Sequence, residues 1–269
     1  MNSFRFENFG DLRGLRVLDL GAGGGRHAIE AARRGAVVVC VELDDEAIAS
    51  IPDNAREAAT YLGVDPAEFG ARIAVVKGDA RALGFRSGSF DVVIASEILE
   101  HIEQDGAVID ELRRCLGIQG SLGISVPRAF PEVLNWSLSL PYHAVAGGHI
   151  RIYTKRGLFG RLRAGGFGEI SRHYSHGLHS PYWWLKCLVG LDNENSALVK
   201  RYHALLVSQL MGNAPRADAA EQILNPILGK SLVVYARRRD RFPREVSEVS
   251  QTTQHRTWLA RIGFGNAQH

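Results

Sequence analysis

A glycine-rich turn between a predicted strand and a predicted helix constrains this chain most. Val17–Leu20 is predicted to be a short buried strand, and Gly21-Ala-Gly-Gly-Gly25 follows it at once. Residues 28–34 then have the pattern of a helix. Glycines let a ligand lie directly against the backbone, and the first N–H groups of a helix point toward it. The stretch therefore predicts a pocket of the nucleotide-binding type.

Apolar runs alternate with helical patterns along the first half of the chain. We predict strands at residues 36–42, 72–77, 90–95 and 120–126, and helices from Asp45, over 96–102 and over 107–116. Continuous apolar runs are typical of strands covered on both faces, and the alternation indicates βαβ units. We therefore expect an α/β fold with a Rossmann-like, doubly wound sheet. Asp44 is the predicted cap of the helix from Asp45, and Pro52 predicts a kink or break in it.

The pattern changes after Pro127. Residues 128–150 and 176–228 are expected to form irregular cap insertions, the second with a helix at about 195–211. Between them we predict a helix over 154–164 and a strand over 167–174, and after them a last strand over 229–236. One domain over residues 1–240 and a polar tail over 241–269 fit the length of 269 residues.

Composition argues against several classes of protein. The chain has 32 basic and 29 acidic residues and a net charge of +3. This balance lacks the excess of basic residues that is typical of nucleic-acid-binding proteins. Cys40, Cys115 and Cys187 form no CxxC pair, so neither a zinc knuckle nor a disulfide framework is indicated. No apolar run has the length of a membrane span or the character of a signal segment. We expect a cytoplasmic protein.

Further polar residues stand at the ends of the next two predicted strands. Glu42 lies 17 residues after Gly25, where a carboxylate accepts hydrogen bonds from both hydroxyls of a ribose. Asp79 and Ala80 follow the third strand, where a carboxylate suits an exocyclic amine and a backbone N–H suits a ring nitrogen. A dinucleotide fingerprint needs its third glycine at position 26, which is Arg26. A dehydrogenase is therefore disfavoured.

These motifs, with Phe90-Asp-Val-Val-Ile-Ala-Ser-Glu-Ile-Leu-Glu-His101, resemble the class I S-adenosylmethionine-dependent methyltransferases. The resemblance covers about residues 15–126, and the last predicted strand fits the family's antiparallel hairpin. It implies a seven-stranded sheet, mostly parallel with an antiparallel last strand, and S-adenosylmethionine over the glycine turn. The residues implied to bind the cofactor are Gly21, Gly23 and Gly25 at the turn, Glu42 at the ribose, Asp79 and Ala80 at the adenine, and Asp19 and Ser96 at the methionine end.

A second group of polar residues follows the fourth predicted strand. Spacings of three and four place Glu97, Glu100 and His101 on one face of the predicted helix. A first-turn acid favoured by the helix dipole and a histidine bonded to a carbonyl would explain this group without a metal. His149 precedes the helix predicted over 154–164. Together with His149, the motif also resembles ubiquinone-pathway O-methyltransferases and the methyltransferases of small-RNA 3′ ends. This resemblance implies Mg²⁺ or Mn²⁺ held by Glu97, Glu100, His101 and His149.

A metal site of this kind suits transfer to a hydroxyl. An aliphatic hydroxyl is a poor nucleophile at neutral pH, and a bound metal lowers its pKa and fixes its direction. A histidine near the metal would accept the proton. His143, in the first insertion, is the first candidate for this catalytic role, and His101 is the second.

The second insertion bears on the acceptor. Tyr182, Trp183 and Trp184 suit stacking on a sugar, quinone or base, but equally anchoring of the insertion or a homodimer contact. The spacing of His173, His176 and His179 in a polar setting favours ordinary hydrogen-bonding roles over a metal cluster. The block resembles actinobacterial methyltransferases of sugars and polysaccharides.

We therefore predict an O-methyltransferase acting on a hydroxyl of a sugar, an oligosaccharide or another polyhydroxylated small molecule. Three alternatives stay open: quinone or phenol O-methylation, RNA 2′-O-methylation, and a non-catalytic cofactor-binding module that regulates a partner.

Overall fold

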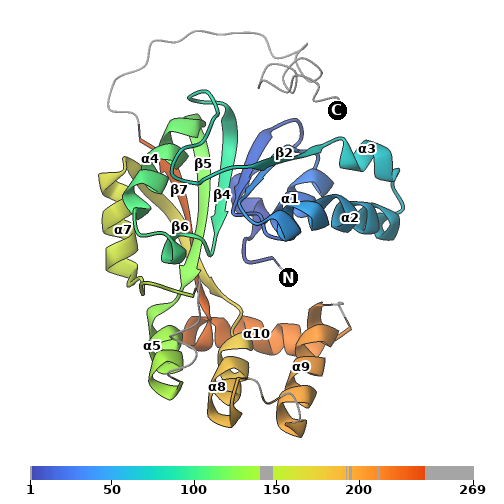
Figure 1. The fold of residues 1–269 in the computed structure, drawn as a ribbon, viewed down its shortest axis with the longest axis vertical. Coiled ribbons are helices and arrows are strands. Elements are labelled where there is room, and N and C mark those ends of the chain that lie inside the picture. Colours follow the sequence, from blue (N-terminus) through green and yellow to red (C-terminus); the bar gives the residue numbers. More distant parts are fainter. Residues whose placement is uncertain (1, 140–147, 192, 194–195, 211–212, 240–269) are drawn as a thin grey trace.

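The described part of the chain is built around a seven-stranded sheet of order β3-β2-β1-β4-β5-β7-β6 (Figure 1). The computed structural model describes residues 2–139, 148–191, 193, 196–210 and 213–239. The strands are β1 Arg16–Leu20, β2 Val37–Glu42, β3 Ile73–Lys77, β4 Phe90–Ser96, β5 Leu116–Pro127, β6 Phe167–Ser175 and β7 Ser231–Arg238. β1 to β5 pair in parallel, and β7 runs antiparallel to β5 and β6. The predicted fold class is confirmed.

Helices cover both faces of this sheet. They are α1 Arg26–Arg33, α2 Asp45–Leu62, α3 Pro66–Gly70, α4 Asp105–Cys115, α5 Ala129–Leu138, α7 Lys155–Ala164, α8 His179–Val189, α9 Ala197–Leu210 and α10 Pro215–Leu228, with 3₁₀ turns η1 Phe6–Phe9 and η2 Leu99–His101. In β1, Leu18 packs in a core cluster that contains Leu112 of α4, whereas Val17 packs in the cluster of Ile51 of α2. Successive strand residues point to opposite faces. Burial on both faces therefore explains the continuous apolar runs of the sequence.

Helices α5, α8, α9 and α10 gather at one end of the sheet, beyond the end of β5 (Figure 1). The sequence predicted irregular structure here, with one helix at about 195–211, and that prediction is wrong for α5, α8 and α10. Large apolar residues of these helices stay in water, such as Leu188 at 68% exposure and Ile223 at 75%. Exposed apolar residues weaken the amphipathic periodicity by which a helix is identified in a sequence.

Pro52, where the sequence predicted a kink or break, does not break α2. The helix runs from Asp45 to Leu62, and the Asp44 side chain caps it by accepting the Ala47 N–H at 2.8 Å. Pro52 is on the exposed side, while Ile51 and Ala55 are buried against the sheet. The packing of the buried face outweighs the loss of one helical hydrogen bond.

The helix predicted over residues 96–102 does not form. Ser96 ends β4, Glu97 has a left-handed φ of 52°, and only Leu99–His101 makes a 3₁₀ turn. The Glu97 N–H donates to the Ser125 carbonyl of β5 at 3.0 Å, which prolongs the pairing of the sheet. This long-range bond diverts the chain from the helical path. In the described residues, no helix is both long and apolar enough to cross a membrane.

Candidate functional site

Two cavities meet at the glycine turn, where β1 ends. The first, of about 550 Å³, is lined by Gly21, Glu42, Asp79, Ala80 and His101, among others. The second, of about 830 Å³, lies on the other side of the turn. Its walls include Gly21, Gly23, Gly24 and Ser96 from the sheet end, and His179, Tyr182, Trp183 and His203 from α8 and α9. The turn therefore lies between the first cavity, at the ends of the strands, and the second cavity, whose other wall is formed by α8 and α9.

The glycines of the turn are required by its backbone. Gly21, Gly23 and Gly25 have φ angles of 66°, 52° and 79°, in the left-handed region that favours glycine. A Cβ atom at Gly21 would also lie 2.7 Å from Cδ1 of Ile98. The predicted turn thus has the tight geometry that lets a ligand approach the backbone.

Glu42 is fixed at the rim of the first cavity by the turn itself. Its Oε2 accepts the Gly23 N–H at 2.8 Å, and its Oε1 accepts the Leu43 N–H at 2.7 Å. Asp79 follows the neighbouring strand β3, and hydrogen bonds from Arg81 lower its pKa to about 2. Both carboxylates line one cavity with Ala80, as the resemblance implies.

The two residues predicted at the methionine end have different surroundings. Asp19 is fully buried, and its Oδ2 accepts the Ala28 N–H at the start of α1 at 3.0 Å. Burial raises the pKa of Asp19 to about 7. Asp19 is not among the residues that line either cavity, so its contact with a ligand stays a prediction. Ser96 lines the second cavity, with its Oγ 3.0 Å from Oγ of Ser125.

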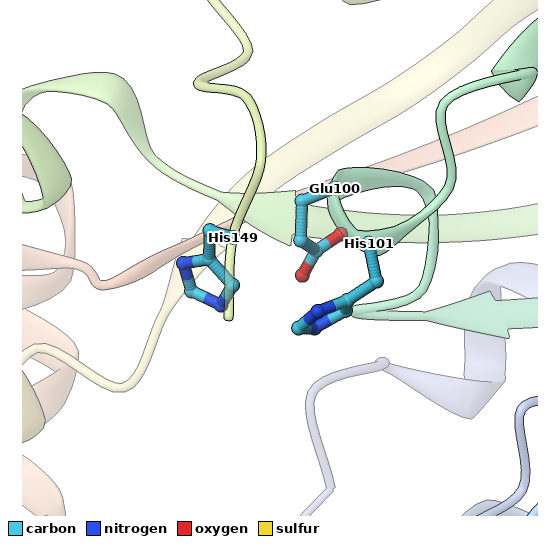
Figure 2. Close-up of side chains that lie close together, drawn as sticks. All are labelled: Glu100, His101 and His149. Atoms are coloured by element: carbon cyan, nitrogen blue, oxygen red, sulfur yellow. The ribbon is translucent and has the colours of Figure 1, made fainter. Parts of the chain in front are cut away.

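Glu100, His101 and His149 converge on one point, as Figure 2 shows. One ligand atom from each lies within 4.8 Å of the others, and the two imidazole centroids are 5.0 Å apart. The Ile150 N–H donates to the Glu100 carbonyl at 3.0 Å, which brings the segment of His149 to the turn after β4. Glu100 is 0% exposed, and neither of its carboxylate oxygens has a hydrogen-bond partner among the described residues.

Both histidines have Nδ1 engaged by an oxygen. His101 Nδ1 lies 3.2 Å from the Gly148 carbonyl, and His149 Nδ1 lies 2.6 Å from Oε1 of Glu132. A carbonyl only accepts, and an ionised carboxylate only accepts, so Nδ1 carries the proton in each neutral ring. The lone pair is then on Nε2, the arrangement found where a histidine binds a metal.

Two buried carboxyl groups of this group have shifted pKa values. Burial raises the pKa of Glu100 well above its usual value, and the charge of Glu97 adds to the rise. Burial also raises the pKa of Glu132, but the hydrogen bond from His149 brings the net value below the usual one. The Glu100 carboxylate has no hydrogen-bond partner among the described residues, and a cation bound between these groups would be such a partner.

The structure brings together three of the four predicted metal ligands. The fourth, Glu97, lines the first cavity and accepts a hydrogen bond from Ser125 Oγ at 3.0 Å. The expectation that Glu97, Glu100 and His101 share a helical face is wrong, because residues 96–102 are not a helix. His143, the first candidate for the catalytic base, lies outside the described residues.

Sequence reasoning missed Glu132. It lies in α5, is 1% exposed, and also accepts the Trp136 Nε1–H at 3.0 Å. It is 17 residues from His149 in the chain, so no helical or strand spacing links the two. The only local signal was an acidic residue within an apolar helix.

The adjacent tryptophans have separate roles. Trp183 lines the second cavity with Tyr182. Trp184 points elsewhere: its Nε1–H donates to the Pro131 carbonyl at 3.4 Å, and its ring meets Phe130 edge to face. One tryptophan thus faces the cavity and the other anchors α8 to α5.

Comparisons with known sequences agree on the N-terminal half. Residues 18–124 match a family model described as a methyltransferase domain. A ubiquinone biosynthesis O-methyltransferase of Caulobacter sp. (strain K31) is 32% identical over 126 residues, which is 45% of this chain and 45% of that protein. The chain thus matches slightly less than half the length of this curated relative. The match to the family model includes the glycine turn and the strands on either side of it.

Solved structures show the same fold over more of the chain. An S-adenosylmethionine dependent methyltransferase from Mesorhizobium loti covers 85% of this chain and 93% of its own, with a TM-score of 0.51 and 16% identity. The cyclase SpnF covers 84% of this chain and 76% of its own, with a TM-score of 0.53 and 21% identity. Because a cyclase shares the fold, the fold does not specify the reaction, which has to be argued from the site.

Proposed function

We propose that this chain is an S-adenosylmethionine-dependent O-methyltransferase that works with a divalent ion, Mg²⁺ or Mn²⁺, held by Glu100, His101 and His149. One observation carries the proposal. A buried carboxylate without a described partner faces two imidazoles whose Nδ1 atoms are both engaged. The two nitrogen ligands favour Mn²⁺ over Mg²⁺, which prefers oxygen.

The cofactor has a cavity of suitable chemistry. The glycine turn offers close backbone approach, Glu42 offers a fixed carboxylate for the ribose hydroxyls, and Asp79 and Ala80 line the same cavity for the adenine. Gly21 lines both cavities, so a donor bound over the turn would reach toward the acceptor side. Placing a hydroxyl oxygen about 3–3.5 Å from the methyl carbon, in line with the sulfur, would supply much of the acceleration.

Further residues of the chain are assigned to orienting the histidine rings, binding the ion and accepting the proton. Glu132 and the Gly148 carbonyl orient the His149 and His101 rings through their Nδ1 atoms. When bound, the divalent ion would lower the pKa of the acceptor hydroxyl. We assign His101 to ion binding, because a ring that uses Nε2 as a ligand and donates through Nδ1 has no site for another proton. His143 stays the predicted base.

The proposed acceptor is a hydroxyl of a sugar or another polyhydroxylated small molecule. Tyr182 and Trp183 give the second cavity aromatic faces, while Ser96, His179 and His203 give it polar groups. Such a mixture suits the apolar faces and hydroxyl edges of a sugar ring. A phenol or quinone-precursor hydroxyl is the second candidate, favoured by the name of the relative that is 32% identical.

Transfer of labelled methyl from S-adenosylmethionine tests the proposal. Acceptor panels of oligosaccharides and of catechol-type phenols are incubated with Mn²⁺ or with EDTA, using wild type, His149→Ala and, as the control, Glu68→Gln at an exposed carboxylate outside both cavities. We expect label on an oxygen of one panel, lost with EDTA and in His149→Ala but retained in the control. Label on no oxygen, with S-adenosylhomocysteine still bound, would support a non-catalytic binding module instead. Transfer that EDTA does not change would refute the metal site.

A further inference from the structure

A second cluster of metal-ligating side chains lies apart from the site described above. It consists of His176, in the turn after β6, His179 at the start of α8, and Glu221 of α10. One ligand atom from each lies within 4.8 Å of the others. The three residues come from segments that meet where the helices at the lower end of Figure 1 join the sheet.

The cluster contains buried polar atoms without a partner. Glu221 is 7% exposed, and its Oε1 has no hydrogen-bond partner among the described residues. His179 Nδ1 is also buried without a hydrogen-bond partner among the described residues. It lies 3.9 Å from Oε1 of Glu221, too far for a hydrogen bond. An unsatisfied buried acceptor and an unsatisfied buried ring nitrogen side by side are costly, and a shared cation satisfies both.

Neighbouring groups prepare the three side chains as ligands. Gln209 Nε2 donates to Oε2 of Glu221 at 2.6 Å, which orients the carboxylate and leaves Oε1 toward His179. His176 Nε2 lies 3.0 Å from Ser3 Oγ, so this bond occupies one ring nitrogen and leaves the other for a ligand.

The backbone at His176 is held in an uncommon conformation. Its φ is 62°, in the left-handed region that a non-glycine residue rarely adopts. The strained turn places the His176 ring 5.2 Å from that of His179, centroid to centroid. Strain of this kind persists where surrounding contacts enforce it and is frequent at binding sites.

We propose that His176, His179 and Glu221 form a binding site for Zn²⁺ or a similar transition-metal ion. Two imidazoles and one carboxylate are a common zinc set, in which ligand atoms about 2.0–2.2 Å from the ion lie roughly 3.3 Å from one another. The 3.9 Å between His179 Nδ1 and Glu221 Oε1 requires only a small contraction. Three protein ligands leave one position to water.

The ion would connect α8, which lines the second cavity, to α10. It joins the β6–α8 turn to α10, and Gln209 extends the connection to α9. His179 itself lines that cavity, with Tyr182 and Trp183 on the following turn of α8. Binding is therefore expected to stabilise this wall, whether or not the chain transfers methyl groups.

Zn²⁺ titration of metal-free protein tests the site in a chain that lacks the first cluster. In His101→Ala/His149→Ala protein stripped with EDTA, calorimetry should show one Zn²⁺ bound per chain, and Zn²⁺ should raise the thermal midpoint. Adding His179→Ala or Glu221→Gln should abolish both effects. Adding His203→Ala, a histidine of the same cavity wall outside the cluster, should change neither.

Co²⁺ gives an independent readout, because its visible absorption reports the ligand geometry. A band of the tetrahedral type should form in the parent and the His203→Ala protein and be absent from the His179→Ala protein. Circular dichroism of each variant shows whether it folds, and Glu221→Gln keeps the side-chain shape if a histidine variant does not fold. The proposal is overturned if the folded parent binds no Zn²⁺, or if binding survives both His179→Ala and Glu221→Gln.

Discussion

The imidazole of His149 lies 2.6 Å, Nδ1 to Oε1, from the buried carboxylate of Glu132. The carboxylate comes from α5 and the imidazole from the segment before α7, so the contact ties the first insertion to the predicted ion site. A carboxylate in this position fixes the ring orientation and raises the basicity of the other nitrogen. The strength of ion binding should therefore depend on a residue that does not touch the ion.

Replacing Glu132 by Gln should weaken Mn²⁺ binding about 10–100-fold, the usual effect of removing such a partner. The amide still accepts a hydrogen bond but no longer carries the charge that polarises His149. Calorimetric titration with Mn²⁺ measures the change, and Glu68→Gln, an exposed carboxylate paired with Arg72, is the control. Equal affinity in wild type and Glu132→Gln would contradict the role.

Replacing Glu100 by Gln should stabilise the metal-free protein by roughly 1–3 kcal/mol at pH 8, because it removes a buried carboxyl group that the unfolded chain ionises freely at that pH. The sign follows from the raised pKa of Glu100, caused by burial and by Glu97. The folded state holds this proton at pH values where the unfolded state has lost it, so wild-type stability falls as pH rises above about 4.5. Denaturant unfolding in EDTA at pH 5 and pH 8 measures the difference.

The same substitution should have the opposite effect when Mn²⁺ is present. Wild type regains stability by binding the ion, whereas Glu100→Gln lacks the anionic ligand and gains little. Equal stabilisation of both proteins by Mn²⁺ would show that Glu100 is no ligand.

Replacing Glu42 by Ala should weaken S-adenosylhomocysteine binding about 10–100-fold, because hydrogen bonds to a charged acceptor contribute roughly 1.5–3 kcal/mol each. The substitution also removes the acceptor of the Gly23 N–H, which shapes the turn. Calorimetry gives the dissociation constant, and Glu46→Ala on the exposed first turn of α2 is the matched control. Unchanged affinity would mean that the ribose lies elsewhere.

Replacing Asp19 by Asn should flatten the pH dependence of stability between about pH 4 and pH 7. Burial raises the pKa of Asp19 to about 7, so its contribution to stability is full below the unfolded value and is lost as pH rises through the folded one. A shift of this size corresponds to about 4 kcal/mol. Asn still accepts the Ala28 N–H. Parallel wild-type and variant curves across this range would contradict the prediction.

Replacing Trp183 by Ala should raise the KM for the acceptor about 10-fold, the loss expected for one aromatic contact of roughly 1–1.5 kcal/mol. The dissociation constant of S-adenosylhomocysteine should not change. Trp184→Phe is the control, because Trp184 contacts Phe130 and Pro131 rather than the cavity. A rise in KM of the same size in both variants would indicate a loss of helix packing instead.

The N-terminal half was predictable because its signals are local. A glycine turn between strand and helix, an acid ending β2 and a polar pair after β3 follow from short stretches of sequence, and parallel strands bring their ends to one edge. Pro52, where a kink or break was predicted, does not break α2, and the helix predicted over 96–102 does not form. In both places contacts with distant residues, the sheet beneath α2 and the Ser125 carbonyl, outweigh local preference.

The sequence by itself therefore determined the α/β fold, the turn that would hold the cofactor and three of the residues that converge as the candidate ion site. Only the tertiary structure decided that Glu132 orients His149, that Glu97 stands apart, and that Glu221 of α10 meets His176 and His179. These contacts join residues from different segments, with no periodic pattern between them. Their positions follow from how the helices pack on the end of the sheet, which no short stretch of sequence encodes.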